Sequence, residues 1–466
     1  MLFNSFEFAL FFGVVFVAFV AAPMRRRAPV LLVASFVFYA LWLPVFVPLL
    51  VGTLVVNYWF LRRMSGAQRR AYLVLSILVT LALLAVFKYS AFALNLVLPV
   101  FPALRSLRNE ALALMLPLGI SFYSFEIISL AVDVYRGRLE CPSFRDYALF
   151  VTFFPHLISG PIMRGGELLP QIASNGARSA ARTRRGLWLF AVGLAKKAIL
   201  SDYLLLPFVS PVFRVPGAAS GPVHLVAMYS FAFQIYFDFS GYTDMARGIA
   251  CVLGFELPKN FEEPYLSRDV TEFWRRWHIT LSRWLRDYLY VPLGGNGRGR
   301  GRTVVNLMIT MLLGGLWHGA GLNFVVWGGV HGMFLAVERL RRKRKQSERA
   351  PLGWRDVPAG IVTFHLICLA WIPFRATSWA ASVAFARGLV SGGYLGNWPI
   401  VPLVTVVLCA ALHVLERTVR PKLPAIYARL ESAPWAPWVE GATLGAMFAS
   451  AALASGGGVE FIYFRF

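Results

Sequence analysis

The chain has 466 residues, of which 58% are hydrophobic and only 15% are charged, and its mean hydropathy is +0.61. An ordinary soluble domain carries about 25% charged residues, so this composition excludes one. Long apolar segments recur throughout and predict an all-α, polytopic integral membrane protein. The formal net charge is +23. Because the charges fall in the loops, they mark the cytoplasmic side and meet anionic lipids, so we expect membrane lipids and no nucleic acid as partners.

Apolar segments divide the chain into expected spans. They cover 3–22, 29–61, 71–87, 92–102, 110–135, 186–209, 222–254, 303–316, 322–340, 358–374, 376–390, 399–415 and 441–454. Pro44 and Pro48 break the second segment, which therefore fits two spans, and the short segment 92–102 is expected to be re-entrant. With about 20 residues needed for each crossing, we expect about 11 to 13 crossings plus re-entrant or interfacial helices.

The first segment is expected to be a retained helix. A cleaved signal carries its positive charge before the apolar run, whereas Arg25, Arg26 and Arg27 follow it. These arginines predict a basic loop on the cytoplasmic side and an N-terminus outside. A further run of seven basic residues over 339–349 predicts another cytoplasmic loop.

Two carboxylates lie inside the apolar segment 110–135. Glu126 and Asp133 are seven residues apart, which places them roughly on one helix face, and Pro117 and Gly119 kink or break the helix before them. They either line an internal cavity or, in the case of Asp133, pair with an arginine of a neighbouring loop. Both alternatives remain open at this point.

The residues 144–164 include Pro155-His156 and Gly160-Pro161, which exclude a regular helix. Irregular backbone at membrane depth is tolerated only where protein or a water-filled cavity covers it. His156 is therefore a candidate to line such a cavity, and a structural role is the alternative.

Charged residues also interrupt two later segments. Lys196 and Lys197, followed by Asp202, indicate an interfacial segment rather than a clean span. In the segment 222–254, Asp238 and Asp244 are expected to reach one face or to cap a helix that breaks at Gly241.

The stretch 271–332 combines titratable groups with apolar surface more strongly than any other part of the chain. It holds three of the seven histidines, His278, His318 and His331, and five of the fourteen tryptophans. Intramembrane polar groups are costly and indicate a function by default. The alternative for each is a buried histidine that is hydrogen-bonded to a neighbouring helix. For His331 we favour that structural alternative.

Residues 271–290 contain no Gly or Pro and predict one amphipathic helix in or near the membrane interface, N-capped by Asp269 or Thr271. Its spacing places Arg275, His278 and Ser282 on a common face. Further along, Gly314, Gly315, Gly319 and Gly321 allow close helix packing and clear space beside His318.

The chemistry is narrowed by what the sequence lacks. It contains no phosphate-binding loop, no GxSxG, no HExxH and no Cys/His metal spacing, and its four cysteines are scattered. We expect neither disulfides nor a metal or bound cofactor. Histidine remains the best acid/base candidate. A hydroxyl that attacks a thioester needs such a base and a group to hold the oxyanion, and His278 or Arg275 is suited to the second task if it approaches His318.

Six motifs in order resemble the bacterial branch of the membrane-bound O-acyltransferase family, and most closely its alginate-acetylating members. They are PLGISFYSFEIISLAVDVYRG at 117–137, FFPHLISGPIMR at 153–164, IYFDFSGYTDMARG at 235–248, FWRRWHITLSRWLRDYLYVPLGGN at 273–296, LLGGLWHGAGLNFVVWGGVHG at 312–332 and the terminal FIYFRF. The resemblance implies one transmembrane domain over 1–466 with a catalytic core of about 117–332. The implied fold is a ring of helices around a thinned centre, where funnels from both sides meet at a catalytic histidine.

The resemblance also implies site residues. His318 matches the catalytic histidine and His278 the second active-site polar residue. His156 stands where relatives usually carry Gln, which favours a position facing the cavity. The candidates to line the substrate tunnel are Trp317, Trp274, Arg275, Ser282, His156 and Asp238. For the tryptophans, a packing role is the alternative.

The implied activity is transfer of an acetyl group from a cytoplasmic thioester, acetyl-CoA, to an extracytoplasmic polysaccharide such as an alginate-like exopolysaccharide or peptidoglycan. A periplasmic SGNH-hydrolase-like acetyltransferase is the implied partner, and the bacterial inner membrane the implied location. Two alternatives stay open: a transporter of polysaccharide or lipid-linked sugar, and a non-catalytic scaffold for the periplasmic enzyme. No matching halves with broken helices, the usual sign of a transporter, are evident in the sequence.

Overall fold

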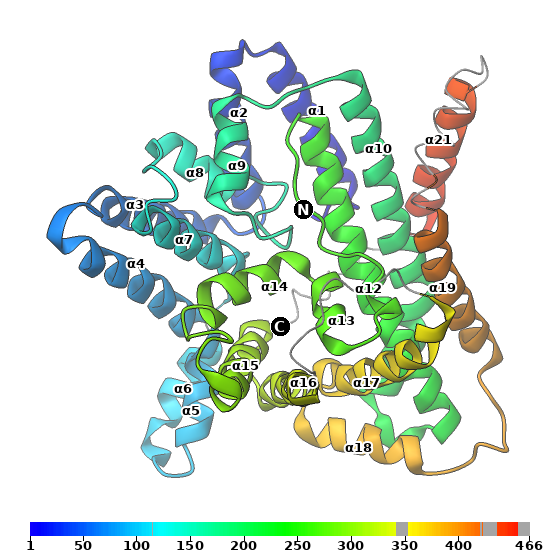
Figure 1. Cartoon of the computed structure of the whole chain (residues 1–466). Coiled ribbons are helices and arrows are strands. Elements are labelled where there is room, and N and C mark those ends of the chain that lie inside the picture. Colours follow the sequence, from blue (N-terminus) through cyan, green and yellow to red (C-terminus); the bar gives the residue numbers. More distant parts are fainter. Residues whose placement is uncertain (114, 342–352, 420–421, 423–435, 455–466) are drawn as a thin grey trace. The chain divides into compact units, whose positions relative to one another are not determined.

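The computed structural model of the chain describes residues 1–113, 115–341, 353–419, 422 and 436–454. The regular secondary structure of these residues is helical throughout, as the composition predicts (Figure 1). Their contacts group into two compact units. Unit 1 comprises Met1–Phe190 and Thr243–Pro258, and unit 2 comprises Ala191–Tyr242 and Lys259–Phe466. The expectation of one domain over the whole chain stays a prediction.

Unit 1 is built from the N-terminal helices. They are α1 (Phe6–Ala21), α2 (Met24–Ala40), α3 (Val47–Arg62), α4 (Arg69–Leu84), α5 (Ser90–Val97), α6 (Arg105–Ala113), α7 (Ile120–Tyr135), α8 (Phe144–Thr152), α9 (Gly165–Ala173) and most of α10 (Ala180–Leu194). Local signals set several of these boundaries. Pro44 begins a short 3₁₀ turn between α2 and α3, and Gly119, with φ of 71°, precedes α7. The backbone between α8 and α9 is irregular, as the proline pairs predict.

One prediction for unit 1 is wrong. The arginines at 25–27 form the first turn of α2 instead of a loop, because Met and Arg, which directly follow Pro23 at the N-cap, are good helix formers. The segment 92–102 does not form a separate element after the preceding span, and its re-entrant position in the membrane stays a prediction. A π-helical turn, η3 (Ala85–Tyr89), joins α4 to α5, so that Gly66–Val97 is one continuous apolar helix.

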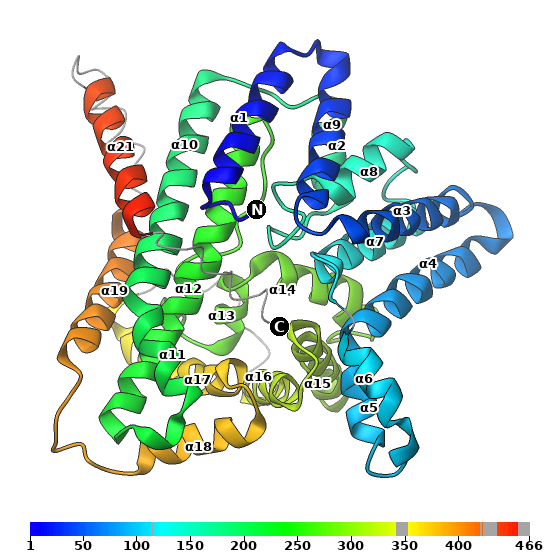
Figure 2. The ribbon, with the colours of Figure 1, turned by 180° about the vertical axis from the view of Figure 1, so that it is seen from behind.

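Unit 2 contains the remaining helices. They are η5 (Ala195–Leu205), α11 (Leu206–Arg214), the first part of α12 (Gly221–Val252), α13 (Val270–Arg276), α14 (Ile279–Leu285), α15 (Gly299–His318), α16 (Leu322–Arg341), α17 (Val357–Arg375), α18 (Trp379–Val390), α19 (Ile400–Val419) and α21 (Ala436–Ala454). Figure 2 shows the helices from the opposite side. The terminal FIYFRF motif and most of the basic run at 339–349 lie outside the described residues.

The core of unit 2 is an antiparallel hairpin of α15 and α16. Its two helices approach at glycines: a Cβ on Gly315 would lie 2.2 Å from the Phe324 carbonyl oxygen, and one on Gly328 would lie 2.3 Å from that of Met311. Only glycine permits this separation. Helix α17 then packs antiparallel to α16, with the Asn323 side chain donating to the Ala376 carbonyl at 2.8 Å. The predicted close packing is therefore confirmed at Gly315, and it brings the helix that ends at His318 close to its neighbours.

The predicted single helix over 271–290 is wrong. The chain forms α13, breaks at Trp277 and His278, and continues as α14 and a π-helical turn, η8 (Arg286–Tyr290). The break is held from outside: the Glu262 amide donates to the Arg276 carbonyl, and the Ile279 amide donates to the Asn260 carbonyl, both at 3.0 Å. The predicted cap at Asp269 is confirmed, since its side chain accepts from the Glu272 amide at 2.8 Å.

The structure bears on two further predictions about charged segments, and of the alternatives for Asp238 and Asp244 the broken helix is wrong. Helix α12 does not break at Gly241, because this glycine packs against the Gly193 carbonyl and the Lys197 amide without leaving the helix. In the segment with Lys196 and Lys197, the Lys197 side chain is only 2% exposed, and the interfacial position of the segment stays a prediction. Carboxylates from the same turn and from α12 compensate its charge, so the ammonium group is buried.

Apolar side chains cover much of the outside of both units. Four helices in the described part of the chain are long and apolar enough to cross a membrane, namely Pro44–Arg62, Gly66–Val97, Val357–Arg375 and Ile400–Val419, and Phe6–Ala21 and Trp379–Val390 are shorter apolar helices. On the last of the four, Val401 is 78% exposed and Val407 59%. Exposed apolar surface of this kind is stable only in lipid. A multi-pass membrane protein is confirmed, and the number of 11 to 13 crossings stays a prediction.

Candidate active site

His318 is the last residue of α15 and is 3% exposed. Three aromatic rings surround its imidazole: the ring centroids of Trp317 and Trp327 lie 4.9 Å away, both edge-on, and that of Phe374 lies 5.3 Å away. These rings come from α15, α16 and α17, which are the three helices of the glycine-packed core. The close packing therefore fixes the imidazole in a largely apolar enclosure.

His278 lies at the break between α13 and α14, and its side chain is fully buried. Its φ of 42° and ψ of 55° place it in the left-handed region, which is uncommon for a residue with a side chain. Asn260 holds the chain immediately after it, because its side-chain oxygen accepts from the Thr280 amide at 3.2 Å and from the Thr280 hydroxyl at 2.7 Å.

The two histidines meet in unit 2. Their ring centroids are 6.4 Å apart, and the Trp317 ring lies beside both, 5.9 Å from His278 and 4.9 Å from His318. Phe239 of α12 packs edge-on against His278 at 4.7 Å. Two buried imidazoles at this separation are suited to hold one small polar group between them, with one ring as the base and the other as a hydrogen-bond donor.

The structure separates the other candidates taken from 271–290. The Trp274 indole donates to His331 Nδ1 at 3.2 Å, and both side chains are buried, a contact of the kind that the structural alternative requires; their roles stay predictions. Arg275 is exposed while His278 is fully buried, so the predicted common face does not exist. The Ser282 hydroxyl donates to the Trp277 carbonyl at 3.2 Å, which supports the backbone break.

Asp238 belongs to a buried charge cluster. The Lys197 ammonium contacts the carboxylates of Asp238 at 2.5 Å and Asp202 at 3.1 Å, and all three side chains are at most 8% exposed. Asp238 therefore compensates the buried lysine. The neighbouring residue in sequence, Phe239, is the one whose ring contacts His278. Asp244 forms a separate ion pair with Arg247 at 3.0 Å.

His156 lies in unit 1 and is 1% exposed. Its Nδ1 is 3.1 Å from a carboxylate oxygen of Glu126, which also accepts from the Met163 amide at 2.9 Å. This arrangement stabilises the irregular backbone after α8 and is the structural role given above as an alternative. Asp133 lies 3.6 Å from Arg138, which confirms its predicted pairing with a loop arginine.

Three residues of the histidine site were missed. Phe374, Phe239 and Asn260 all shape it, and each comes from a segment distant in the sequence. The Phe374 and Phe239 rings look like ordinary apolar residues of a span, so no sequence signal marks them. Asn260 carries a weak signal, since a buried amide in a polar connector needs partners.

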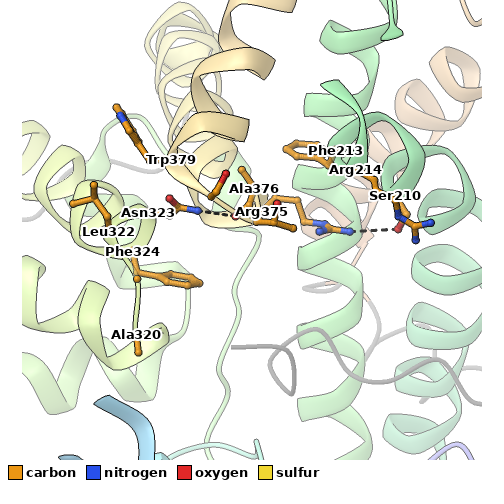
Figure 3. A pocket seen from close by; sticks show the side chains of 13 residues that line it. Ser210, Phe213, Arg214, Ala320, Leu322, Asn323, Phe324, Arg375, Ala376 and Trp379 are labelled. Carbon is orange, nitrogen blue, oxygen red and sulfur yellow. Dashed lines mark hydrogen bonds between the residues drawn. The ribbon is translucent and has the colours of Figure 1, made fainter. Parts of the chain in front are cut away.

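A cavity of about 560 Å³ opens beside the turn that follows His318 (Figure 3). Ala320, Leu322 and Phe324 form one side, and Ser210, Arg214 and Arg375 lie across from them. Arg375 Nη2 donates to the Ser210 hydroxyl at 3.3 Å. Within the described residues, no group of three or more His, Cys, Asp or Glu is placed to hold a metal ion.

Comparison with known proteins matches residues 31–373 to the membrane-bound O-acyltransferase family. The chain is 38% identical over 408 residues to the probable alginate O-acetylase AlgI of Pseudomonas aeruginosa, covering 86% of this chain and 76% of that protein. It is 37% identical over 393 residues to the peptidoglycan O-acetyltransferase of Helicobacter pylori, covering 77% and 73%. Identity to the teichoic acid D-alanyltransferase of Bacillus subtilis is 28% over 272 residues, covering 55% and 68%.

Proposed function

We propose that this chain, which belongs to the membrane-bound O-acyltransferase family, moves an acetyl group from acetyl-CoA to hydroxyl groups of an extracytoplasmic polysaccharide. The single observation that carries this proposal is the buried His278–His318 pair, with ring centroids 6.4 Å apart beside Trp317. The relatives named for O-acetylation act on alginate or peptidoglycan according to their names, and both acceptors carry hydroxyl groups on sugars.

In the proposed reaction, a neutral His318 removes the proton from an acceptor hydroxyl as its oxygen attacks the thioester carbonyl carbon. The tetrahedral intermediate carries a negative oxygen, toward which an N–H of His278 donates. Collapse of the intermediate breaks the carbon–sulfur bond, and the imidazolium of His318 returns the proton to the leaving thiolate. The products are the O-acetyl ester and free CoA, and both histidines end as they began.

The basic residues of unit 2 support a cytoplasmic entry for the donor. Arg298, Arg300 and Arg302 lie at the start of α15, and Arg339 and Arg341 lie at the end of α16. By the positive-inside rule, these helix ends face the cytoplasm. Because the two helices are antiparallel, His318 and the turn after it lie at the opposite end of the hairpin. The acceptor would then approach from the outer side of a bacterial inner membrane, alone or through a periplasmic SGNH-hydrolase-like partner.

Donor turnover tests the proposal. The purified full chain in nanodiscs receives radiolabelled acetyl-CoA, with and without a polysaccharide acceptor, and release of CoA and transfer of label are followed. We expect His318→Ala to lose nearly all turnover while retaining the wild-type thermal unfolding profile. The matched control is His365→Ala on α17, where the histidine is exposed and its Nδ1 donates to the Ile361 carbonyl at 2.7 Å.

Full turnover by His318→Ala would contradict the proposed chemistry. A scaffold would be favoured if the wild type releases no CoA with any acceptor and if His318→Ala still supports polymer acetylation by a periplasmic enzyme. Flux of polysaccharide into vesicles without an acetyl donor would favour a transporter.

A further inference from the structure

Asn260 makes three hydrogen bonds to the two residues that follow His278. Its carbonyl accepts from the Ile279 amide at 3.0 Å. Its side-chain oxygen accepts from the Thr280 amide at 3.2 Å and from the Thr280 hydroxyl at 2.7 Å. Asn260 is 1% exposed and Thr280 5%, so these bonds lie in a low-dielectric interior, where hydrogen bonds are stronger than in water. We call these three bonds the Asn260 clamp.

The Asn260 clamp holds a backbone conformation that the local sequence does not favour. His278 has φ of 42° and ψ of 55°, in the left-handed region, where a β-carbon crowds the following carbonyl oxygen. Residues 271–290 contain no Gly or Pro, and on their own they are compatible with one continuous helix. Tertiary contacts must therefore impose the break, and the clamp supplies three of the hydrogen bonds that do so.

The backbone conformation of His278 decides where its imidazole lies. The φ angle sets the rotation of the side chain about the N–Cα bond relative to α13. A change from 42° to the helical value of about −63° would rotate the side chain by about 100°. In the clamped conformation, the imidazole centroid lies 4.7 Å from that of Phe239 and 6.4 Å from that of His318. Loss of the clamp would therefore separate the proposed hydrogen-bond donor from the proposed base.

We propose that Asn260 and Thr280 are positioning residues for the acyl transfer, which keep the His278 imidazole beside His318 without contacting the substrate themselves. The inference rests on the proposed function and adds to it the residues that hold one of its two histidines in place. Without the clamp, the segment 271–290 relaxes toward a continuous helix, whereas the aromatic enclosure of His318 is unchanged because its rings come from α15, α16 and α17. The expected defect is therefore a lower kcat with an unchanged KM for acetyl-CoA.

Three variants separate the clamp from ordinary packing. Asn260→Ala removes both side-chain bonds, and Thr280→Val removes the hydroxyl while keeping the size of the side chain. Asn260→Asp is the conservative variant: among the described residues no acceptor contacts the Asn260 amide nitrogen, so aspartate retains each hydrogen bond that the structure shows.

Turnover of acetyl-CoA by the full chain in nanodiscs measures the effect. We expect kcat to fall about 100-fold in Asn260→Ala, since a displacement of about 1 Å in an active site costs that much. In Thr280→Val the fall should be about tenfold, as the loss of one hydrogen bond implies. Asn260→Asp should keep most of the wild-type turnover.

A spectroscopic signal follows His278 independently of turnover. The full chain with ¹³C-labelled histidine side chains, in detergent micelles, is expected to give seven histidine signals, and that of His278 is assigned by its absence in His278→Gln. Because the Phe239 ring lies edge-on 4.7 Å from the imidazole, its ring current shifts this signal. Asn260→Ala and Thr280→Val should move the signal toward that of free histidine, and Asn260→Asp should leave it in place.

Asn57→Ala is the matched control. Asn57 is 2% exposed, and its side-chain oxygen accepts from the hydroxyls of Ser76 at 2.7 Å and Thr80 at 3.2 Å, so it is a buried asparagine with the same kind of contacts in unit 1. Its loss should lower the melting temperature about as much as Asn260→Ala does. The His278 signal and the turnover per folded molecule should both stay at the wild-type values.

Two results would overturn the inference. One is an unmoved His278 signal together with unchanged turnover in folded Asn260→Ala and Thr280→Val; if Asn260→Ala does not fold, Thr280→Val alone decides. The other is an equal displacement of the signal in Asn57→Ala, which would show general loosening. Failure of the proposed function looks different: the wild type would turn over no acetyl-CoA while the His278 signal still responds to Thr280→Val. The clamp would then stand as a structural contact, and its assignment to acyl transfer would fall.

Discussion

Helices α17 and α19 have similar lengths and hydropathies, but they differ in how much of their surface the protein buries. They have 19 and 20 residues, and both are apolar enough to cross a membrane. Yet 44% of the apolar stretch is buried in α17 and only 17% in α19. Helix α17 supplies Phe374 and Trp371 to the aromatic enclosure of the histidine site, whereas α19 turns most of its valines and leucines outward.

This difference in burial shows that hydropathy identifies an apolar helix but does not tell whether the helix faces lipid or protein. A lipid tail and a protein interior are equally apolar, so a run of apolar residues identifies a span without saying which solvent it meets. The distinction lies in shape: α17 carries two large aromatic rings that fill space beside a histidine, while the outward face of α19 carries side chains that need no partner.

The largest contrast is expected from truncating one apolar side chain on each helix. Phe374→Ala removes a ring that is fully buried beside His318, and it should cost about 3–5 kcal/mol of stability and most acetyl-CoA turnover. Val407→Ala removes a side chain that is 59% exposed, and it should change stability by less than about 0.5 kcal/mol. Thermal unfolding followed by tryptophan fluorescence, together with turnover, measures both. Equal effects would show that α19 is packed against protein.

Two adjacent lysines extend the comparison to charge. Lys197 is buried between two carboxylates, whereas Lys196, whose side chain is 12% exposed, pairs with Glu416 of α19 at 3.3 Å. Lys197→Met should cost about 3–5 kcal/mol, because it leaves buried carboxylates without their cation. Lys196→Met should cost clearly less. Adding Asp238→Asn to Lys197→Met should restore part of the loss, and a double variant less stable than Lys197→Met would argue against charge as the cause.

Two glycines, Gly328 in α16 and Gly445 in α21, provide a further comparison between a closely packed helix and one with open space beside it. Gly328→Ala places a Cβ 2.3 Å from the Met311 carbonyl oxygen, so the α15–α16 hairpin must separate at a cost of about 1–3 kcal/mol. At Gly445 in α21 nothing lies within 4 Å, and Gly445→Ala should leave stability unchanged or raise it by up to about 1 kcal/mol through helix propensity. The melting temperatures of the two purified variants, compared with that of the wild type, measure both effects on stability. A destabilised Gly445→Ala would mean that α21 meets a partner.

The smallest effect is expected at Glu272, in the first turn of α13. Burial raises the pKa of this carboxyl, but hydrogen bonds from Arg268 and the charge of Arg276 outweigh it and hold the pKa below the ordinary 4.5. A lowered pKa stabilises the fold above the unfolded value and loses that contribution as pH falls through the folded one. Glu272→Gln should therefore melt slightly earlier than the wild type at neutral pH. The gap should close well below pH 4.5, and a gap that widens with acid would contradict the assigned direction.

Sequence reasoning succeeded where a residue acts on its own backbone. Pro44, Gly119 and Asp269 each end or begin a helix by local geometry, and each is found at its predicted boundary. The pairing of His318 with His278 came from the family resemblance and a pattern of glycines, and the fold brings the two rings together.

It failed where a distant residue decides the outcome. The break at His278 depends on Asn260, whose side chain holds Thr280 from 20 residues away, so a helix-compatible sequence does not form one helix. Burial of Lys197 depends on Asp238, 41 residues away. In both cases the local pattern predicts the structure that an isolated segment would prefer, and tertiary contacts impose a different one.

The left-handed backbone at His278 has a consequence for how variation at this position is to be understood. With φ of 42° and ψ of 55°, the site admits Gly, Asn, Asp or His at modest strain and penalises β-branched residues heavily. The backbone conformation alone therefore restricts this position to a few, mostly polar residue types, whether or not the residue takes part in catalysis.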